Sequence, residues 1–280
     1  MTTRTITRVV TAQPATDGAG VKINRNAGFD GELRMDPFLM LDEIRSESKD
    51  DFIAGFPAHP HRGFETVTYM REGRFSHRDS MGNSGAISGG GAQWMTAGSG
   101  VIHSEMPAAG ADRMHGFQFW LNLPASEKMM PPAYRDIQAE EIGELHHQDA
   151  RIRLIAGDLT LGETAHTGVV SGKTTRALIA DVTLPTGNAG IGYAPELSSQ
   201  FYLYRGTVNV AQTTVRAGQL AYLSHGEQLE LSEADNAGLL LFGGLPLAEP
   251  VVHYGPFVMN TREQIEQALQ DYRDGVLVQS

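Results

Sequence analysis

Short runs of β-type residues recur along the whole chain, and glycine or proline separates one run from the next. Clear examples are Thr66–Met70 (TVTYM), Gly116–Leu123 (GFQFWLNL), Arg176–Leu184 (RALIADVTL), Phe201–Tyr204 (FYLY) and Leu239–Phe242 (LLLF). Many short strands that follow one another through turn residues are typical of sandwiches and barrels rather than of alternating strand–helix units. The sequence therefore predicts an all-β fold with antiparallel sheets.

The 280 residues are more than the roughly 150 of an average domain, so two domains are expected. A faint internal repeat favours two similar β-domains in tandem. Tyr69–Gly73 followed by Gly91–Gly98 resembles Tyr202–Gly206 followed by Gly218–Gly226, each pair reading as a strand, a turn and a later strand that begins with glycine. Chance similarity between strands punctuated by glycine is the alternative explanation.

The composition changes over residues 126–149, which hold two adjacent prolines, several acidic residues and two adjacent histidines. We interpret this segment as the connection between the domains, with a short helix around residues 137–142. The expected boundaries are an N-terminal barrel at 1–135, a linker at 136–150 and a C-terminal barrel at 151–280.

One helix is predicted near the end of the chain, in NTREQIEQALQDYRDG. Asn260 can cap its start, and Glu263 follows three residues later, as in a capping box. The apolar residues that follow at helical spacing are Ile265, Ala268, Leu269 and Tyr272. They give the helix one apolar face, and Gly275 is placed to end it. We expect the helix to pack against a sheet of the second domain.

The chain is acidic, with 22 basic against 33 acidic side chains and a net charge of −11. Such a surface repels phosphate backbones, so direct nucleic-acid binding is disfavoured. Cysteine is absent, and any metal site must therefore use imidazole and carboxylate ligands. The first ten residues lack an apolar signal core, and Gly238–Leu247 is too short to span a bilayer. We expect a cytoplasmic protein that has no contact with membranes.

The densest chemical signal lies in AHPHRGFETVTYM, residues 58–70. His59 and His61 are two residues apart, so on a strand both imidazoles emerge on one face. Glu65 has the same parity. Taken alone, two such histidines fit a buried structural pair as well as they fit a pair of metal ligands.

A second pair raises the case for a metal. In TAGSGVIHSEM a glycine-rich turn leads into a strand on which His103 and Glu105 share a face. Two such pairs can meet inside a barrel, where three imidazoles and one carboxylate suit Fe, Mn, Ni, Co, Cu or Zn. A set of this size leaves coordination positions open, as a catalytic metal requires.

Two further histidines have simpler interpretations. We expect His77, in the hairpin FSHRDSMG, to be a solvated loop residue, with the mouth of the barrel as the alternative. His115 begins the strand HGFQFWLNL and shares a face with Phe117, Phe119 and Leu121, so we expect a satisfied core histidine.

Three blocks near these pairs resemble the pirin family of the cupin superfamily: HPHRGFETVTYM, GAQWMTAGSGVIHSEMP and HGFQFWLNLP. The tail VHYGPFVMNTREQIEQALQDYRDG, residues 252–275, is similar to the C-terminal signature of the family. The resemblance extends from about residue 20 to 275 and is weak between about 140 and 245. It implies two tandem cupin-type barrels, of which only the N-terminal one holds a metal, usually iron.

The resemblance also implies the ligands. The pirin pattern places them at His59, His61, His103 and Glu105, and all four positions match. The general cupin pattern would instead use Glu65, four residues after the second histidine, and spacing alone does not choose between the two carboxylates. We follow the pirin pattern, so that Glu65 becomes a residue that orients an imidazole or a bound water.

Two functions follow from the resemblance. The first is an Fe(II)-dependent dioxygenase that opens flavonols such as quercetin with O₂ and releases CO, with Glu105 or Glu65 taking the proton of the 3-hydroxyl group. The second is an iron-dependent redox sensor that regulates a partner protein. Another metal-assisted reaction on a small metabolite, such as an isomerisation, is a third alternative. An open pocket with room for a flat aromatic molecule favours the enzyme, whereas a filled pocket beside an apolar surface favours the regulator.

Overall fold

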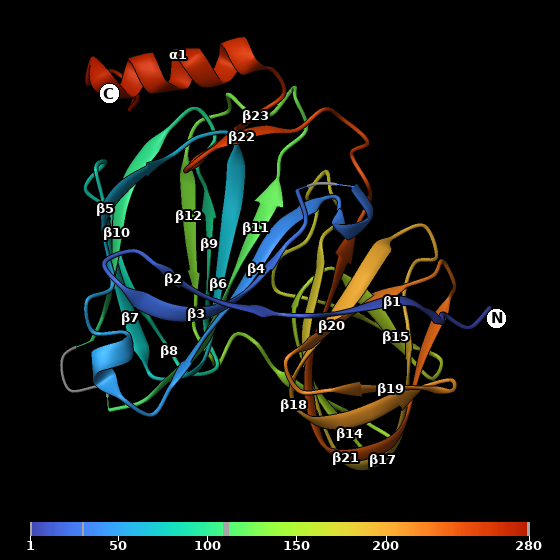
Figure 1. Cartoon of the computed structure of the whole chain (residues 1–280). Coiled ribbons are helices and arrows are strands. Elements are labelled where there is room, and N and C mark those ends of the chain that lie inside the picture. The colour runs from blue at the N-terminus through green and yellow to red at the C-terminus, as the bar shows by residue number, and fades with distance from the viewer. Residues whose placement is uncertain (1, 30, 109–111, 279–280) are drawn as a thin grey trace. The chain divides into compact units, whose positions relative to one another are not determined.

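The runs of β-type residues form antiparallel sheets in a computed structural model that describes residues 2–29, 31–108 and 112–278 (Figure 1). Contacts divide the chain into two compact units. The N-terminal barrel comprises Pro14–Arg34, Phe38–Glu141 and Leu247–Ser280, and the C-terminal barrel comprises Met1–Gln13, Met35–Pro37 and Ile142–Pro246. The prediction of an all-β, antiparallel fold is confirmed.

Two sheets make up most of the N-terminal barrel. The larger has the order β12 (Ala133–Ile137), β9 (Ala92–Thr96), β6 (Phe64–Glu72), β11 (Met114–Asn122), β4 (Phe38–Ser46), β3 (Val21–Ala27) and β2 (Gln13–Asp17). The smaller has the order β5 (Phe56–His61), β10 (Val101–Pro107), β7 (Arg74–Asp79) and β8 (Ser84–Ser88). Two single-turn 3₁₀ helices, η1 (Gly31–Leu33) and η2 (Lys49–Asp51), lie on either side of β4 in the sequence.

The end of the chain also packs on the N-terminal barrel. It forms a two-stranded sheet of β22 (Val252–Tyr254) and β23 (Phe257–Met259), followed by α1 (Arg262–Arg273). On α1, Ile265 and Ala268 are buried against Phe257 and Met259. Within the described ranges, no helix is both long enough and apolar enough to cross a membrane.

The predicted helix is confirmed, but its cap lies one residue later than expected. Thr261 is the N-cap, and its hydroxyl accepts a hydrogen bond from the backbone N–H of Gln264, whose side chain accepts from the Thr261 backbone in return. Asn260 uses its side-chain amide instead to donate to Glu249 Oε2 and to the Pro250 carbonyl, so that amide holds the preceding loop. Gly275 has a positive φ of 73°, as expected of a residue that ends a helix.

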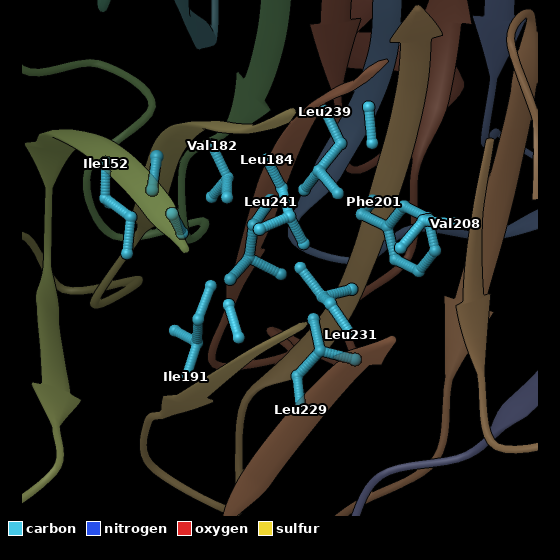
Figure 2. Packing of buried hydrophobic residues seen from close by; sticks show 14 of the residues in the cluster. Ile152, Val182, Leu184, Ile191, Phe201, Val208, Leu229, Leu231, Leu239 and Leu241 are labelled. Carbon is cyan, nitrogen blue, oxygen red and sulfur yellow. The ribbon is translucent and has the colours of Figure 1, made fainter. Parts of the chain in front are cut away.

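The C-terminal barrel is one large sheet. Its main path is β1 (Ile6–Thr11), β20 (Gln219–Leu223), β18 (Ser198–Val210), β21 (Gln228–Gly244), β17 (Leu178–Gly192), β14 (Ala150–Ala156) and β13 (Glu144–His147). Off this path, β15 (Asp158–Leu161) pairs with β16 (Thr164–Thr167) and β17, and β19 (Thr213–Arg216) pairs with β18. Inward-facing aliphatic residues, together with the aromatic ring of Phe201, form its core (Figure 2).

The expected domains were single continuous ranges of the chain, and the two units differ from them at both ends of the chain. Strand β1 pairs with β20 of the C-terminal barrel, and the tail from Leu247 onward belongs to the N-terminal barrel. The short helix expected at residues 137–142 is wrong. Ile137 is paired with Ala92 in the sheet, and Glu141 N–H donates to the Gln138 carbonyl in a turn, so too few residues remain for a helix.

Candidate metal centre

Strands β5 and β10 bring the two same-face pairs together. In their antiparallel register His59 lies opposite His103, and His61 lies opposite Val101. Along β10 the buried positions alternate with more exposed ones, so that Val101, His103 and Glu105 all face the interior. The alternation of a half-buried strand therefore places one imidazole and one carboxylate beside the two imidazoles of β5.

Three imidazoles converge in this part of the barrel. One ring nitrogen from each of His59, His61 and His103 lies within 4.8 Å of the other two, and no other such group of three or more ligand side chains occurs in the described ranges. The Nε2 atoms of His59 and His103 are 3.0 Å apart. His103 is 1% exposed and His61 is 4% exposed, so water contributes little to solvating these rings.

Backbone carbonyls set the tautomers of two of the rings. His59 Nδ1 is 2.8 Å from the Pro57 carbonyl, and His61 Nδ1 is 3.3 Å from the Pro256 carbonyl. A carbonyl only accepts, so each Nδ1 carries a hydrogen and each Nε2 presents a lone pair. Lone pairs that face one another repel unless a cation or a proton lies between them. The arrangement therefore fits a divalent metal ion held by imidazole nitrogens.

Burial keeps the histidines neutral. Desolvation by burial, opposed by the nearby Glu105 carboxylate, lowers the pKa of His103 to about 4. Burial, together with the neighbouring His103 and His59, holds the pKa of His61 well below its usual range. Only a neutral imidazole can bind a metal, so both rings are ready to act as ligands at neutral pH.

Glu105 adds a carboxylate beside the imidazoles. One of its oxygens is 4.0 Å from His103 Nε2. Gln118 Nε2 donates to both carboxylate oxygens, at 2.9 and 3.2 Å, and the Thr68 hydroxyl donates to one of them at 3.2 Å. These three hydrogen bonds hold the buried carboxylate in place. Three imidazoles and an adjoining carboxylate suit a single first-row divalent ion.

Glu65 occupies a different position. It lies opposite Thr96 and Leu121 in the sheet, and its Oε1 accepts a hydrogen bond from the Thr96 hydroxyl at 2.6 Å. The preceding residue, Phe64, is the one whose ring packs 5.1 Å from the ring of His61. Side chains alternate along a strand, so Glu65 points to the other face of β6. The structure thus brings His59, His61 and His103 together, places Glu105 beside His103, and directs Glu65 elsewhere.

A cavity of about 690 Å³ lies over His59 and His61. Much of its wall is aromatic and comes from Phe29, Phe56 and Trp120. The ring of Phe29 stacks on His253 at 4.1 Å and meets Trp120 edge-on at 6.5 Å. A cavity of this size, with apolar walls and a few polar groups, is typical of small-molecule sites.

Sequence reasoning missed several residues of the cavity. Arg25 lines it and forms ion pairs with Asp17, also in the lining, and with Asp42. His253 and Pro256 belong to the tail, and no local pattern links them to a site almost 200 residues earlier. Gln118 could have been found, because it shares a strand face with Trp120 and because a glutamine on a predicted core strand needs a polar partner.

The predictions for His77 and His115 have different outcomes. The prediction that His77 is a solvated loop residue is wrong, because the hairpin is formed by the paired strands β7 and β8. His77 is 7% exposed, and its Nε2 is 2.9 Å from Asp136 Oδ2. The core assignment of His115 is confirmed, because the residue is buried and its Nε2 is 3.0 Å from Glu43 Oε1.

Comparison with known proteins agrees with this architecture. The model of the pirin family matches residues 20–121, and the model of the pirin C-terminal cupin domain matches residues 179–278. A protein of Vibrio cholerae named "putative quercetin 2,3-dioxygenase" is 49% identical over 97% of both chains, and human pirin is 36% identical over 96% of this chain and 92% of its own.

Among solved structures, quercetin 2,3-dioxygenase from Acinetobacter baumannii superposes with a TM-score of 0.88 at 30% identity, over 98% of each chain. The predicted pair of cupin-type barrels with a C-terminal helix is therefore confirmed. The chain belongs to the pirin family of the cupin superfamily.

Proposed function

We propose that the protein is an Fe(II)-dependent dioxygenase that opens flavonols such as quercetin with O₂ and releases CO. The observation that carries the proposal is the aromatic-walled cavity that adjoins the histidine cluster. The quercetin 2,3-dioxygenase names of the Vibrio and Acinetobacter relatives support it.

The cavity suits a flat, polyhydroxylated aromatic substrate. Phe29, Phe56 and Trp120 offer ring faces and edges to planar rings, which gain about 0.5–1.5 kcal/mol per favourable aromatic pair beyond burial of area. Arg25 and Asp17 add charged groups to the same lining, where phenolic hydroxyls can form hydrogen bonds. An aliphatic metabolite would leave the ring surfaces poorly covered.

In this proposal the ion is held by His59, His61, His103 and Glu105. When bound, it supplies positive charge that stabilises a flavonolate anion and a redox centre for reaction with O₂. The buried imidazoles fix its position. Glu105, held by Gln118 and Thr68, accepts the proton of the 3-hydroxyl group. Glu65 faces away and serves the packing of β6 against β9.

The other function expected from the sequence was a redox-sensing regulator of a partner protein. That function would be favoured by a filled pocket beside a broad apolar surface. The cavity over His59 and His61 favours the enzyme instead, because it leaves room for a small molecule next to the ligand nitrogens.

The test begins with purified protein whose metal content is measured and which is then loaded anaerobically with Fe(II). Quercetin is added with and without O₂, and loss of quercetin, uptake of O₂ and release of CO are followed together. Equal consumption of O₂ and quercetin with one CO per turnover supports the proposal. Iron-loaded protein that consumes neither and releases no CO refutes it.

A matched pair of variants guards against contaminating activity. His103→Ala removes a buried cluster ligand and should abolish both metal binding and turnover. His146→Ala removes an exposed histidine, whose side chain is 68% exposed and pairs with Glu144, and should leave both unchanged.

A further inference from the structure

The tail of the chain reaches the histidine cluster. Residues 252–277, which we call the C-terminal strap, comprise β22, β23, α1 and the four residues after it. The strap follows the last strand of the C-terminal barrel in sequence, yet it packs within the N-terminal barrel. Three of its residues, His253, Gly255 and Pro256, line the cavity over His59 and His61.

The strap sets the orientation of one ring in the cluster. The Pro256 carbonyl is the acceptor that holds His61 Nδ1–H, and this contact directs His61 Nε2 toward the other imidazoles. His59 obtains the same restraint from Pro57, only two residues away on its own strand. The orientation of His61 therefore depends on a segment 195 residues later in the chain.

The backbone just after His61 is bonded to the same segment. Val258 N–H donates to the Arg62 carbonyl at 3.1 Å. The buried Lys128 ammonium donates to the carbonyls of both Gly63 and Val258, at 2.7 and 3.1 Å, and so joins the turn to β23. Glycine is required at position 63, because its φ is +89° and a Cβ there would lie 2.1 Å from the Val258 carbonyl oxygen.

The side chain of Arg62 extends this connection to the helix. Its guanidinium is almost fully buried and donates through Nη1 to Asp271 Oδ2 at 2.6 Å and through Nε to the Ser99 carbonyl at 2.6 Å. Asp271 lies on α1, which Ile265 and Ala268 hold against β23. A buried arginine that loses its carboxylate partner is costly, so docking of α1 and the position of Arg62 depend on each other.

We propose that Arg62 and Asp271 are positioning residues of the metal centre, and that docking of the C-terminal strap and binding of a divalent cation at the histidine cluster stabilise each other. This inference rests on the proposed function only in requiring that the cluster bind a divalent cation. It requires no flavonol chemistry. Because coupling between two equilibria is reciprocal, a cation that binds more tightly when the strap is docked must also tighten the docking.

The first measurement is a titration of metal-stripped protein with Ni²⁺ in the absence of any flavonol. Asp271→Asn should weaken Ni²⁺ binding by about tenfold, as expected when a residue that supports a metal ligand is lost. Asp274→Asn is the matched control, because Asp274 is the C-cap of the same helix and its side chain accepts only from Gln270 in the described contacts. Asp271→Glu, which can still reach Arg62, should restore most of the affinity.

Two further readouts separate positioning from general destabilisation. With Co²⁺ as the probe, the visible absorption spectrum of Asp271→Asn should differ from that of the wild type, since ligand geometry sets the spectrum. In the wild-type chain, saturating Ni²⁺ should slow amide hydrogen exchange in β23 and α1. The exchange experiment needs no variant, so it remains decisive if Asp271→Asn does not fold.

The outcomes are distinct. The inference is overturned, and the proposed function is left intact, if Asp271→Asn binds Ni²⁺ as tightly as the wild type. The same holds if Ni²⁺ does not change the rate of amide hydrogen exchange in the strap of the wild type. Coupling without quercetin turnover supports the inference and refutes the dioxygenase. Wild-type protein that binds no divalent cation overturns both.

Discussion

Gln118 Nε2 donates to both carboxylate oxygens of Glu105, and the Thr68 hydroxyl donates to Oε1, the one that lies farther from Gln118. The carboxylate is therefore held from the sheet of β6 and β11, whereas the imidazoles come from β5 and β10. Glu105 can act as ligand or base only at the position that these two side chains allow.

Gln118→Leu should show this dependence. The substitution keeps the approximate volume but removes both hydrogen bonds, so we expect kcat/KM for quercetin to fall about tenfold or more. Gln200→Leu is the control, because Gln200 is a buried glutamine in the C-terminal barrel, whereas Gln118 is partly buried and lines the cavity. Similar losses in the two variants would mean that the effect comes from stability rather than from Glu105.

The two carboxylates that the sequence could not separate should behave differently. Glu105→Gln removes the charge beside His103, so we expect metal content after dialysis to fall at least tenfold. Glu65→Gln keeps an acceptor for the Thr96 hydroxyl, and metal content should stay within about twofold of the wild type. Elemental analysis of both variants decides the matter, and the reverse pattern would assign the ligand to Glu65.

Local patterns were enough to predict the strands and the cluster. Thr66–Met70 lies inside β6, and the parity of His59, His61, His103 and Glu105 placed them on interior faces. Both predictions depend on alternation within one strand, which a sequence displays directly. Glu65 entered as the alternative ligand of the general cupin pattern, and its parity with His61 did not exclude it. That parity does not hold across the turn at Arg62 and Gly63, where β5 ends and β6 begins.

The role of the tail could not be predicted in the same way. Pro256 meets His61 through a backbone carbonyl, and neither residue type nor spacing marks such a contact. Arg62 and Asp271 are an ordinary arginine and an ordinary helical aspartate until the fold brings them together. The pairing of Arg25 with Asp42 is hidden for the same reason. Contacts of this kind depend on tertiary packing, which local propensity does not encode.

The buried histidines should make the metal-stripped protein sensitive to acid. The pKa of His103 is lowered to about 4, whereas an unfolded chain has its histidine near 6.5. Between these pH values the unfolded state binds a proton that the folded state does not. The contribution of neutral His103 to the free energy of unfolding is therefore fully present above pH 6.5 and is lost as the pH falls toward 4. His103 alone should account for about 3 kcal/mol of this loss.

Urea unfolding of protein kept in EDTA, at a series of pH values from 7 to 4, measures this loss. His103→Gln removes the titrating group while keeping a polar side chain, so its stability should depend less steeply on pH over the same range. A slope equal to that of the wild type would show that His103 does not account for the acid sensitivity.

The aromatic wall should determine substrate affinity rather than metal binding. Phe29→Ala removes the ring that stacks on His253, so we expect KM for quercetin to rise about fivefold to tenfold while metal content stays unchanged. Phe29→Tyr keeps the ring and should behave like the wild type. Steady-state kinetics on iron-loaded protein measure both, and an unchanged KM in Phe29→Ala would place the substrate elsewhere.

Two glycines with the same φ make it possible to measure how much the close approach of β23 to the turn after His61 contributes to stability. Gly63 and Gly82 both have φ of +89°, but a Cβ at Gly82 meets nothing within 4 Å, whereas one at Gly63 meets the Val258 carbonyl. Gly82→Ala should therefore cost only the backbone strain, about 1 kcal/mol. Gly63→Ala should cost at least about 2 kcal/mol more, because β23 must move away.

The displacement should also reach the metal centre, since Pro256 and Val258 lie on the same short segment. We expect Gly63→Ala to weaken Ni²⁺ binding and Gly82→Ala to leave it unchanged, with unfolding free energies and Ni²⁺ titrations measured on both variants. Equal losses of unfolding free energy in the two variants would indicate that the strap can move away from residue 63 without strain. Its carbonyl could then impose little orientation on His61, and the loss of Ni²⁺ affinity would disappear along with the difference in stability.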